Sequence, residues 1–187
     1  MFFSINLNFG VSMIKKVSIS IIAILLLLIA VPQNSAAKEY HQQISVDPLG
    51  LIFGMFNVQY EKQYSAKNSF TANLQYWGYS SGIYKWSAIG VGGSWRFYLM
   101  QDDILAIRGF SFGPLAQINY WSWTGSSVSS LDGGLSVSIG GEASYKWIFD
   151  NDFSVEPTFK LFFPLNNLEG LGGLQSYGLG CNIGYAW

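Results

Sequence analysis

One stretch decides the fold: Leu135-Ser-Val-Ser-Ile-Gly-Gly-Glu-Ala-Ser-Tyr-Lys-Trp-Ile-Phe149. Every second residue, starting from Leu135, is apolar or glycine, and the residues between them are polar or small, with Ile148 as the exception. Because successive side chains of a β-strand point to opposite faces, the alternation predicts a strand with one apolar and one polar face. It is also long, since strands of soluble proteins usually have about five or six residues.

The same two-residue period recurs along the chain and predicts eight strands. They cover residues 44–53, 56–64, 69–76, 88–99, 110–120, 135–149, 155–163 and 178–187. The first strand is less regular, and we expect it to bend at Asp47-Pro48. Pro114 and Pro157 lie inside expected strands and lack the N–H group that a strand ladder needs, so we expect β-bulges beside them.

The segments between these strands alternate in character. Short polar turns at 65–68, 101–103 and 150–152 alternate with segments at 80–82, 121–134 and 164–173 that are richer in Gly, Ser and aromatic residues. Short turns at one end and longer loops at the other are typical of outer-membrane barrels. The turn at 150–152 has three residues, which places Phe149 opposite Phe153.

Composition narrows the classes of function. The chain has 187 residues, of which 50% are hydrophobic, 17% aromatic and only 11% charged, against about 25% charged in a typical soluble domain. The net charge of −1 and the lack of a basic block exclude a nucleic-acid partner. One cysteine and one histidine exclude an internal disulfide and a multi-histidine metal site, so we expect no cofactor. His41 is the only candidate general base and has no carboxylate partner identifiable from spacing, so no enzyme activity is expected.

Residues 1–37 have the features of a cleaved signal peptide. Lys15 and Lys16 precede an uncharged apolar run at 17–31, and Ser35 and Ala37 occupy the small-residue positions of a cleavage site. A helix of this run would measure roughly 22 Å, which is too short for the ~30 Å core of a bilayer. We expect translation to start at Met13 and the barrel to occupy residues 38–187.

The polar face of the strands favours a barrel that is polar inside and apolar outside. That face consists mostly of Gly, Ser, Ala and Asn, which suit a narrow lumen better than a surface in contact with water. Aromatic residues near the strand ends predict two girdles, as at a membrane interface. They are Tyr64, Trp95, Trp147 and Trp187 at one end and Trp77, Trp86, Tyr120, Trp121 and Trp123 at the other. The expected fold is all-β, an eight-stranded antiparallel up-and-down transmembrane β-barrel; a secreted soluble lipocalin-like ligand binder is the alternative.

Six charged residues fall on the polar face and should form a lumen charge network. They are Glu61, Arg96, Glu142, Lys146, Glu156 and Lys160. The three acids and three bases sum to zero, as charges away from water should. The turn at 150–152 sets a register in which Glu142 faces Lys160 and Lys146 faces Glu156. We expect the network to plug the lumen, which in an eight-stranded barrel is just wide enough for side chains to fill; an ion path or gate is the alternative.

The end of the chain resembles a known signal. In their spacing, Leu179, Cys181, Ile183, Tyr185 and Trp187 resemble the carboxy-terminal signal that the outer-membrane barrel assembly machinery recognises. Several further stretches resemble an uncharacterised family of small outer-membrane barrels from Gram-negative bacteria. They are residues 47–54 (DPLGLIFG), 57–61 (NVQYE), 95–98 (WRFY), 113–114 (GP), 141–142 (GE) and 184–187 (GYAW).

This resemblance implies a fold and a location, the bacterial outer membrane, but no reaction. The implied partners are outer-membrane lipids, the barrel assembly machinery and periplasmic chaperones, and barrels of this size are mostly monomers. Two functions remain open. One is a structural or surface-interaction role, with Trp121 and Trp123 beginning a recognition loop. The other is passage or binding of a small apolar molecule, through the lumen or between strands near Pro114.

Overall fold

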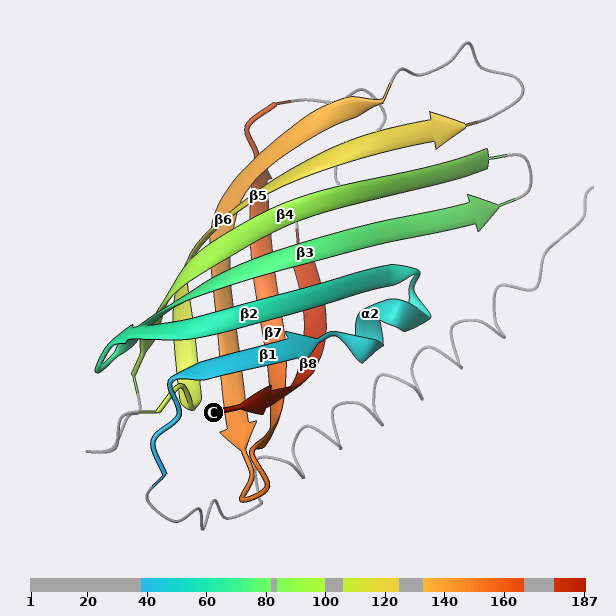
Figure 1. The fold of residues 1–187 in the computed structure, drawn as a ribbon. Coiled ribbons are helices and arrows are strands. Elements are labelled where there is room, and N and C mark those ends of the chain that lie inside the picture. Colours follow the sequence, from blue (N-terminus) through green and yellow to red (C-terminus); the bar gives the residue numbers. More distant parts are fainter. Residues whose placement is uncertain (1–37, 82–83, 100–105, 125–132, 167–176) are drawn as a thin grey trace, which may run out of the picture. The chain divides into compact units, whose positions relative to one another are not determined.

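The computed structural model describes residues 38–81, 84–99, 106–124, 133–166 and 177–187. These residues form a closed barrel of eight antiparallel strands in chain order (Figure 1). β1 pairs with both β2 and β8, which closes the barrel. The strands are β1 (Gln42–Val46), β2 (Met55–Ser65), β3 (Asn68–Ser81), β4 (Tyr84–Tyr98), β5 (Gly109–Thr124), β6 (Gly134–Ile148), β7 (Phe153–Pro164) and β8 (Tyr177–Ala186).

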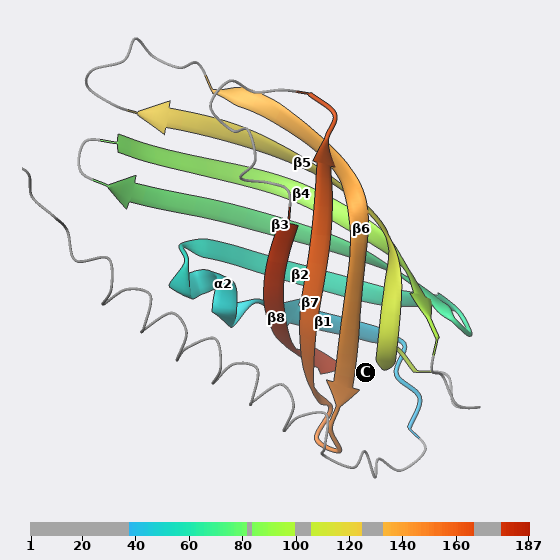
Figure 2. The same ribbon diagram turned by 180° about the vertical axis from the view of Figure 1, so that it is seen from behind.

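The expected division into short turns at one end of the barrel and longer loops at the other is only partly present: residues 99–108 connect β4 to β5 at the end that holds the short β2–β3 and β6–β7 turns, whereas residues 82–83 alone connect β3 to β4 at the other end. We call the end that holds the β2–β3 and β6–β7 turns the turn end, and the opposite end the loop end. Both chain ends of the described barrel lie at the turn end: Lys38 contacts Asp152 of the β6–β7 turn, the Ala186 N–H donates to the Asp152 carbonyl, and Figure 2 marks the C-terminus there. Among the described residues, no helix is long and apolar enough to cross a membrane.

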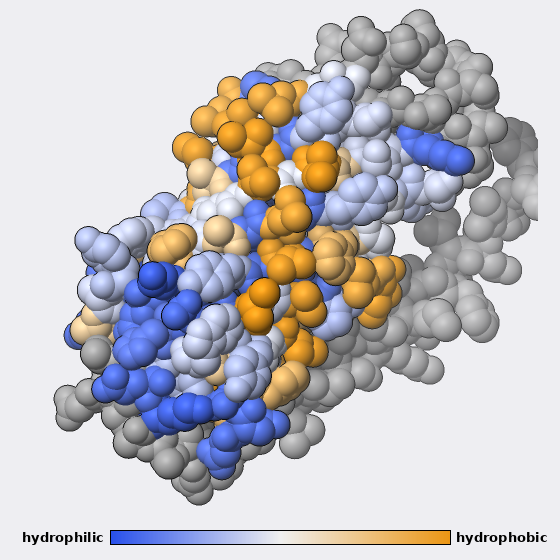
Figure 3. Space-filling view, viewed as in Figure 1, coloured by the Kyte–Doolittle hydropathy of each residue, from blue (hydrophilic) through white to orange (hydrophobic). Residues whose placement is uncertain are grey.

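The polar face of the strands points inward and the apolar face outward. Five inward-facing side chains that are at most 2% exposed are Glu61, Arg96, Ser138, Glu156 and Asn182. Five outward-facing ones that are 54–69% exposed are Ile89, Val91, Leu135, Phe163 and Leu179. Figure 3 shows hydrophobic side chains across the middle of the visible face and hydrophilic ones near the β2–β3 turn. This arrangement is the expected one and is opposite to that of the lipocalin-like alternative.

The expected first strand is wrong beyond Val46. β1 ends there, and a one-turn helix, α2 (Pro48–Ile52), follows in place of a bent strand. The side chain of Asp47 caps this helix, since its Oδ1 accepts the backbone N–H groups of Leu49 and Gly50, both at 3.1 Å. Asp at the cap and Pro at the first helical position favour a helix start.

The bulges expected at the two prolines are also wrong. Each ladder keeps its register and lacks two residue pairs, that of the proline itself and the next one, because the proline has no N–H group to donate. In the ladder of β6 and β7 the second missing pair is the predicted one of Lys146 with Glu156. The flanking pairs are Ser94–Leu115 and Phe97–Phe112 for Pro114, and Ser144–Thr158 and Trp147–Val155 for Pro157. The register shift present in the described strands lies between Gln63 and Ser65 of β2.

The three-residue turn between β6 and β7 is confirmed. The Phe149 N–H donates to the Phe153 carbonyl at 2.8 Å, and the Asp152 N–H donates to the Phe149 carbonyl at 2.9 Å. Asp152 has φ 66°, the left-handed conformation that the last residue of such a turn adopts. Glu142 is therefore paired with Lys160, which confirms the predicted register.

Candidate functional site

Five charged residues meet inside the barrel in a cluster that we call the charge layer: Glu61, Arg96, Glu142, Lys146 and Glu156. Arg96 is at its centre. Its Nε donates to Glu142 at 2.5 Å, and its Nη1 donates to Glu61 at 2.8 Å and to Glu156 at 2.5 Å. The four residues come from β4, β6, β2 and β7, and their side chains are at most 2% exposed. The Arg96 side chain therefore joins carboxylates across the lumen.

Lys146 completes the layer on the side of Glu61. Its ammonium contacts the Glu61 carboxylate and lies 3.6 Å from Glu156 Oε2. The second oxygen of Glu61 accepts the Tyr98 hydroxyl at 2.6 Å and the Ser69 hydroxyl at 2.5 Å. Ion pairs and hydrogen bonds compensate most of the loss of water around these charges, although Arg96 Nη2 and Glu156 Oε2 are buried without a hydrogen-bond partner in the described part of the chain.

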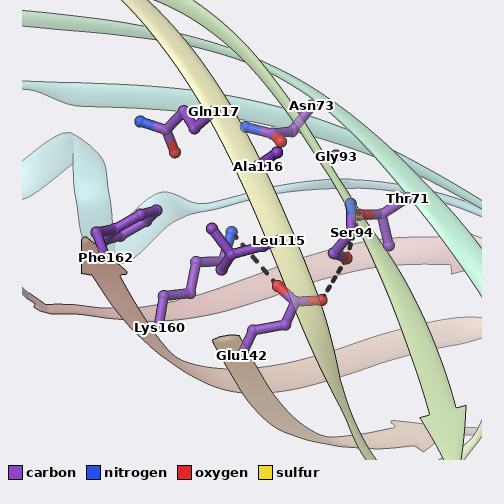
Figure 4. Close-up of a pocket in the computed structure, with 10 residues that line it drawn as sticks. All are labelled: Thr71, Asn73, Gly93, Ser94, Leu115, Ala116, Gln117, Glu142, Lys160 and Phe162. Atoms are coloured by element: carbon purple, nitrogen blue, oxygen red, sulfur yellow. Dashed lines mark hydrogen bonds and ion pairs between the residues drawn. The ribbon is translucent and has the colours of Figure 1, made fainter. Parts of the chain in front are cut away.

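Lys160, the sixth predicted charge, is held less tightly than the others. Its Nζ lies 3.9 Å from Glu142 Oε2, its side chain is 18% exposed, and it donates no hydrogen bond within the described residues. The other oxygen of Glu142 already accepts Arg96 and the Ser94 hydroxyl, each at 2.5 Å. Figure 4 shows Lys160 directed at Glu142, with Phe162 and Gln117 farther along the lumen.

A hydrophobic cluster fills the lumen at the turn end. Its members are at most 2% exposed: Tyr40, Tyr98, Ala106, Ile107, Ile148 and Ala186. The Ile107 N–H donates to the Tyr40 carbonyl at 3.1 Å, so the segment before β5 is bonded to the residues before β1. Sequence reasoning missed this cluster, although Ile148, the apolar residue on the polar face of β6, was a signal for it.

Beyond the charge layer, toward the loop end, the lumen contains a cavity of about 390 Å³. Its apolar walls include Phe53, Met55, Trp77 and Phe162, and its polar ones include Asn57, Gln117, Lys160 and Asn182. The side chains expected to fill the lumen therefore close only one part of it. Sequence reasoning missed this cavity because alternation gives the direction of a side chain but not the space around it.

The predicted position of Trp121 is wrong. Trp121 and Trp123 lie within β5, and Trp121 is 1% exposed, so it does not begin an exposed loop. Trp121 packs against Trp77 and Trp86, with ring centroids 5.5 Å and 5.8 Å apart. The three tryptophans form a cluster with Ala88. They are therefore not part of the expected outer girdle. The following residues, 125–132, lie outside the described residues.

The residues that resemble an assembly signal lie along the outer face of β8. Leu179, Tyr185 and Trp187 are exposed, and Cys181 and Ile183 are partly exposed. Their role in assembly stays a prediction.

His41, the one histidine, is exposed next to Glu39. Its Nε2 lies 3.3 Å from Glu39 Oε2 and its Nδ1 lies 2.7 Å from Gln63 Oε1. A carboxylate partner is thus present, although none was expected from spacing. Both ring nitrogens have these polar neighbours, and neither neighbour is a hydroxyl or thiol that His41 could activate as a general base. No group of His, Cys, Asp or Glu in the described part of the chain is suited to hold a metal ion.

Comparison with known proteins supports the fold. No family model matches the chain, and no curated protein matches it. Among solved structures, the chain is similar to the outer-membrane protein Ail of Yersinia pestis, whose backbone structure was determined in a phospholipid bilayer nanodisc. The TM-score is 0.50 at 12% identity, over 80% of this chain and 100% of that chain. This likeness confirms the predicted fold class, a small eight-stranded antiparallel barrel of the kind found in bacterial outer membranes.

Proposed function

We propose that the chain is an integral protein of the bacterial outer membrane with a structural or surface-interaction role, and that its lumen is plugged near the turn end. The charge layer carries this proposal, since Arg96 links carboxylates of three other strands and none of these side chains is more than 2% exposed. The hydrophobic cluster at the turn end is a second barrier. Ions would have to break several buried ion pairs to pass, at a cost of several kcal/mol.

The outward face of the strands supports a membrane location. Exposed large hydrophobic side chains occur on all eight strands, whereas soluble monomers rarely expose apolar patches beyond about 300–600 Å². In this proposal residues 1–37 direct export and residues 179–187 are recognised by the barrel assembly machinery, with periplasmic chaperones as further partners. A surface interaction would use the connections at the loop end.

Heat modifiability on a gel tests the membrane barrel. Residues 38–187 are refolded in detergent and run unboiled and boiled, together with a circular dichroism spectrum. We expect a band that shifts on boiling and a β-type spectrum. A chain that stays soluble without detergent and shows no shift would contradict the membrane location.

Conductance in planar bilayers tests the plug. We expect no channel activity from the wild-type protein, and we expect Glu142→Lys to destabilise the barrel, because it places a cation beside Arg96 and Lys160. Glu39→Lys makes the same charge reversal on the exposed surface and is the matched control. If Glu142→Lys conducts while its unfolding midpoint stays unchanged, the plug is refuted and the ion-path alternative applies.

A further inference from the structure

Beside the cavity, a short helix completes the barrel wall in place of a full strand ladder. β1 pairs with β8 only over Ile183–Ala186, and the remainder of β8, Tyr177–Asn182, faces the short helix α2. Asp47 replaces a ladder partner there, because its Oδ1 accepts the Cys181 N–H at 3.2 Å. In Figure 1, α2 continues from the end of β1 between β2 and β8. A one-turn helix thus separates the cavity from the apolar outer surface.

The charged groups around the cavity are already compensated by ion pairs or by hydrogen bonds. The charge layer and Lys160 sum to zero, and Asp47 is held by three backbone N–H groups. A ligand with a net charge would therefore bring an uncompensated charge into a site with little water, which is costly.

Two buried polar atoms on the cavity wall have no hydrogen-bond partner. Asn182, which is 2% exposed, has an unpaired Nδ2, and Asn57 has an unpaired Oδ1. Lys160 also lines the cavity and donates no hydrogen bond within the described residues. The site therefore offers donors and an acceptor to a polar ligand head, next to the apolar walls of Trp77 and Phe162.

We propose that this cavity binds an uncharged single-chain amphiphile, whose hydroxyl or carbonyl groups bond to Asn182, Asn57 and Lys160 and whose chain packs against Trp77 and Phe162. The volume of about 390 Å³ lies in the range of small-molecule pockets. The entrance from the bilayer is the seam between α2 and β8, where α2 carries the exposed apolar residues Leu51 and Ile52. This proposal rests on the proposed membrane location and develops the alternative of a small apolar ligand.

Glycines provide a blocking variant and a matched control. A Cβ at Gly178, on the cavity wall, would meet its nearest atoms, in Phe162 and Lys160, at 3.6 Å and 3.9 Å, so Gly178→Leu fits the backbone and places a side chain in the part of the cavity beside Phe162. Gly141 is equally permissive, with its nearest atom at 3.8 Å, but belongs to the outward face of β6. Gly141→Leu adds the same side chain without entering the lumen.

Full-length mature protein in phosphatidylcholine nanodiscs is titrated with monolauroylglycerol, dodecanoate and dodecyltrimethylammonium. Detergent is left out, because it would compete as an amphiphile. The side-chain amide resonances of Asn57 and Asn182 report binding. We expect saturable one-to-one binding of monolauroylglycerol, at least about tenfold tighter than that of either charged probe. We expect Gly178→Leu to abolish it and Gly141→Leu to leave it unchanged.

Asn182→Leu tests the polar contact separately. It removes an unpaired buried amide, so without ligand the barrel should be as stable as the wild type or more so, while monolauroylglycerol binding weakens about tenfold. Equal binding of monolauroylglycerol by the wild type and by Gly178→Leu would refute the proposed site. Binding of dodecanoate that is tighter than binding of monolauroylglycerol would refute the proposed class of uncharged ligand. All variants are first checked for the heat-dependent gel shift, so a folded barrel that does not bind refutes this inference and leaves the proposed function standing.

Discussion

Removal of the Arg96 guanidinium should destabilise the barrel more than any exposed charge substitution. Arg96→Met leaves three carboxylates and two ammonium groups in the lumen, a sum of −1 where the wild type has zero. Glu156 loses its 2.5 Å partner and keeps only Lys146 at 3.6 Å. Breaking a buried ion pair by removing one partner costs about 3–5 kcal/mol, so we expect the free energy of unfolding to fall by that amount.

A double variant separates charge balance from lost packing. Arg96→Met combined with Glu156→Gln restores a sum of zero and leaves two separate pairs, Glu61 with Lys146 and Glu142 with Lys160. We expect the double variant to be more stable than the sum of the single effects, with an interaction energy of about 2 kcal/mol.

Urea unfolding in micelles, followed by tryptophan fluorescence, measures both effects. With a slope of about 2 kcal/mol per molar urea, the midpoint of Arg96→Met should fall by about 2 M. Lys62→Gln, which removes an exposed cation from β2, is the control and should change stability by no more than about 0.5 kcal/mol. A loss below about 1 kcal/mol for Arg96→Met, or strict additivity in the double variant, would refute the reasoning.

Three further predictions use the same unfolding assay or a titration. Ile107→Ala should cost about 2–5 kcal/mol, because it opens a void in the cluster at the turn end; a loss under about 0.5 kcal/mol would mean that this segment does not pack in solution. Gly113→Ala should destabilise by about 1–3 kcal/mol, since its Cβ would lie 1.7 Å from the Trp95 carbonyl oxygen, whereas Gly141→Ala should be nearly neutral; equal effects would contradict the close approach of β4 and β5. The hydrogen bond from Lys38 holds the pKa of Asp152 below its usual 3.8. The ionised Asp152 carboxylate therefore stabilises the folded barrel above pH 3.8, and this stabilisation is lost as the pH falls through the lower pKa of the folded state. The stability difference between wild type and Asp152→Asn should vanish under these acidic conditions, and a carbon-13 titration that places the Asp152 carboxyl at or above 3.8 would contradict this.

The sequence was sufficient to predict the direction of the side chains in most strands and the register of β6 with β7. Two-residue periodicity predicted which face of each strand points inward, and a three-residue turn after Phe149 was enough to pair Glu142 with Lys160. Both are local properties, because a strand fixes side-chain direction and a tight turn fixes the register of its two strands.

Contacts across the lumen could not be predicted in this way. Arg96 meets Glu142 and Glu156 only because the barrel closes, and no ladder register relates β4 to β7. The helix at Pro48 was missed for a different reason: the apolar residues after it continue the hydrophobic pattern of β1, and the capping role of Asp47 outweighs that pattern.

The size of inward-facing residues explains why the lumen is closed in one part and hollow in another. An eight-stranded barrel has an interior just wide enough for side chains to fill it, so long side chains such as Arg96 and Lys146 close the part that they occupy. On β8 the inward positions near the loop end are Gly178 and Gly180. Because neither has a side chain, the part of the lumen beside them stays hollow. Gly180 must also stay small, because a Cβ there would lie 2.8 Å from the Asp47 carboxylate that joins α2 to β8. The glycines that allow a helix to complete the wall therefore also create the space behind it, which makes cavity and seam a single feature of the fold.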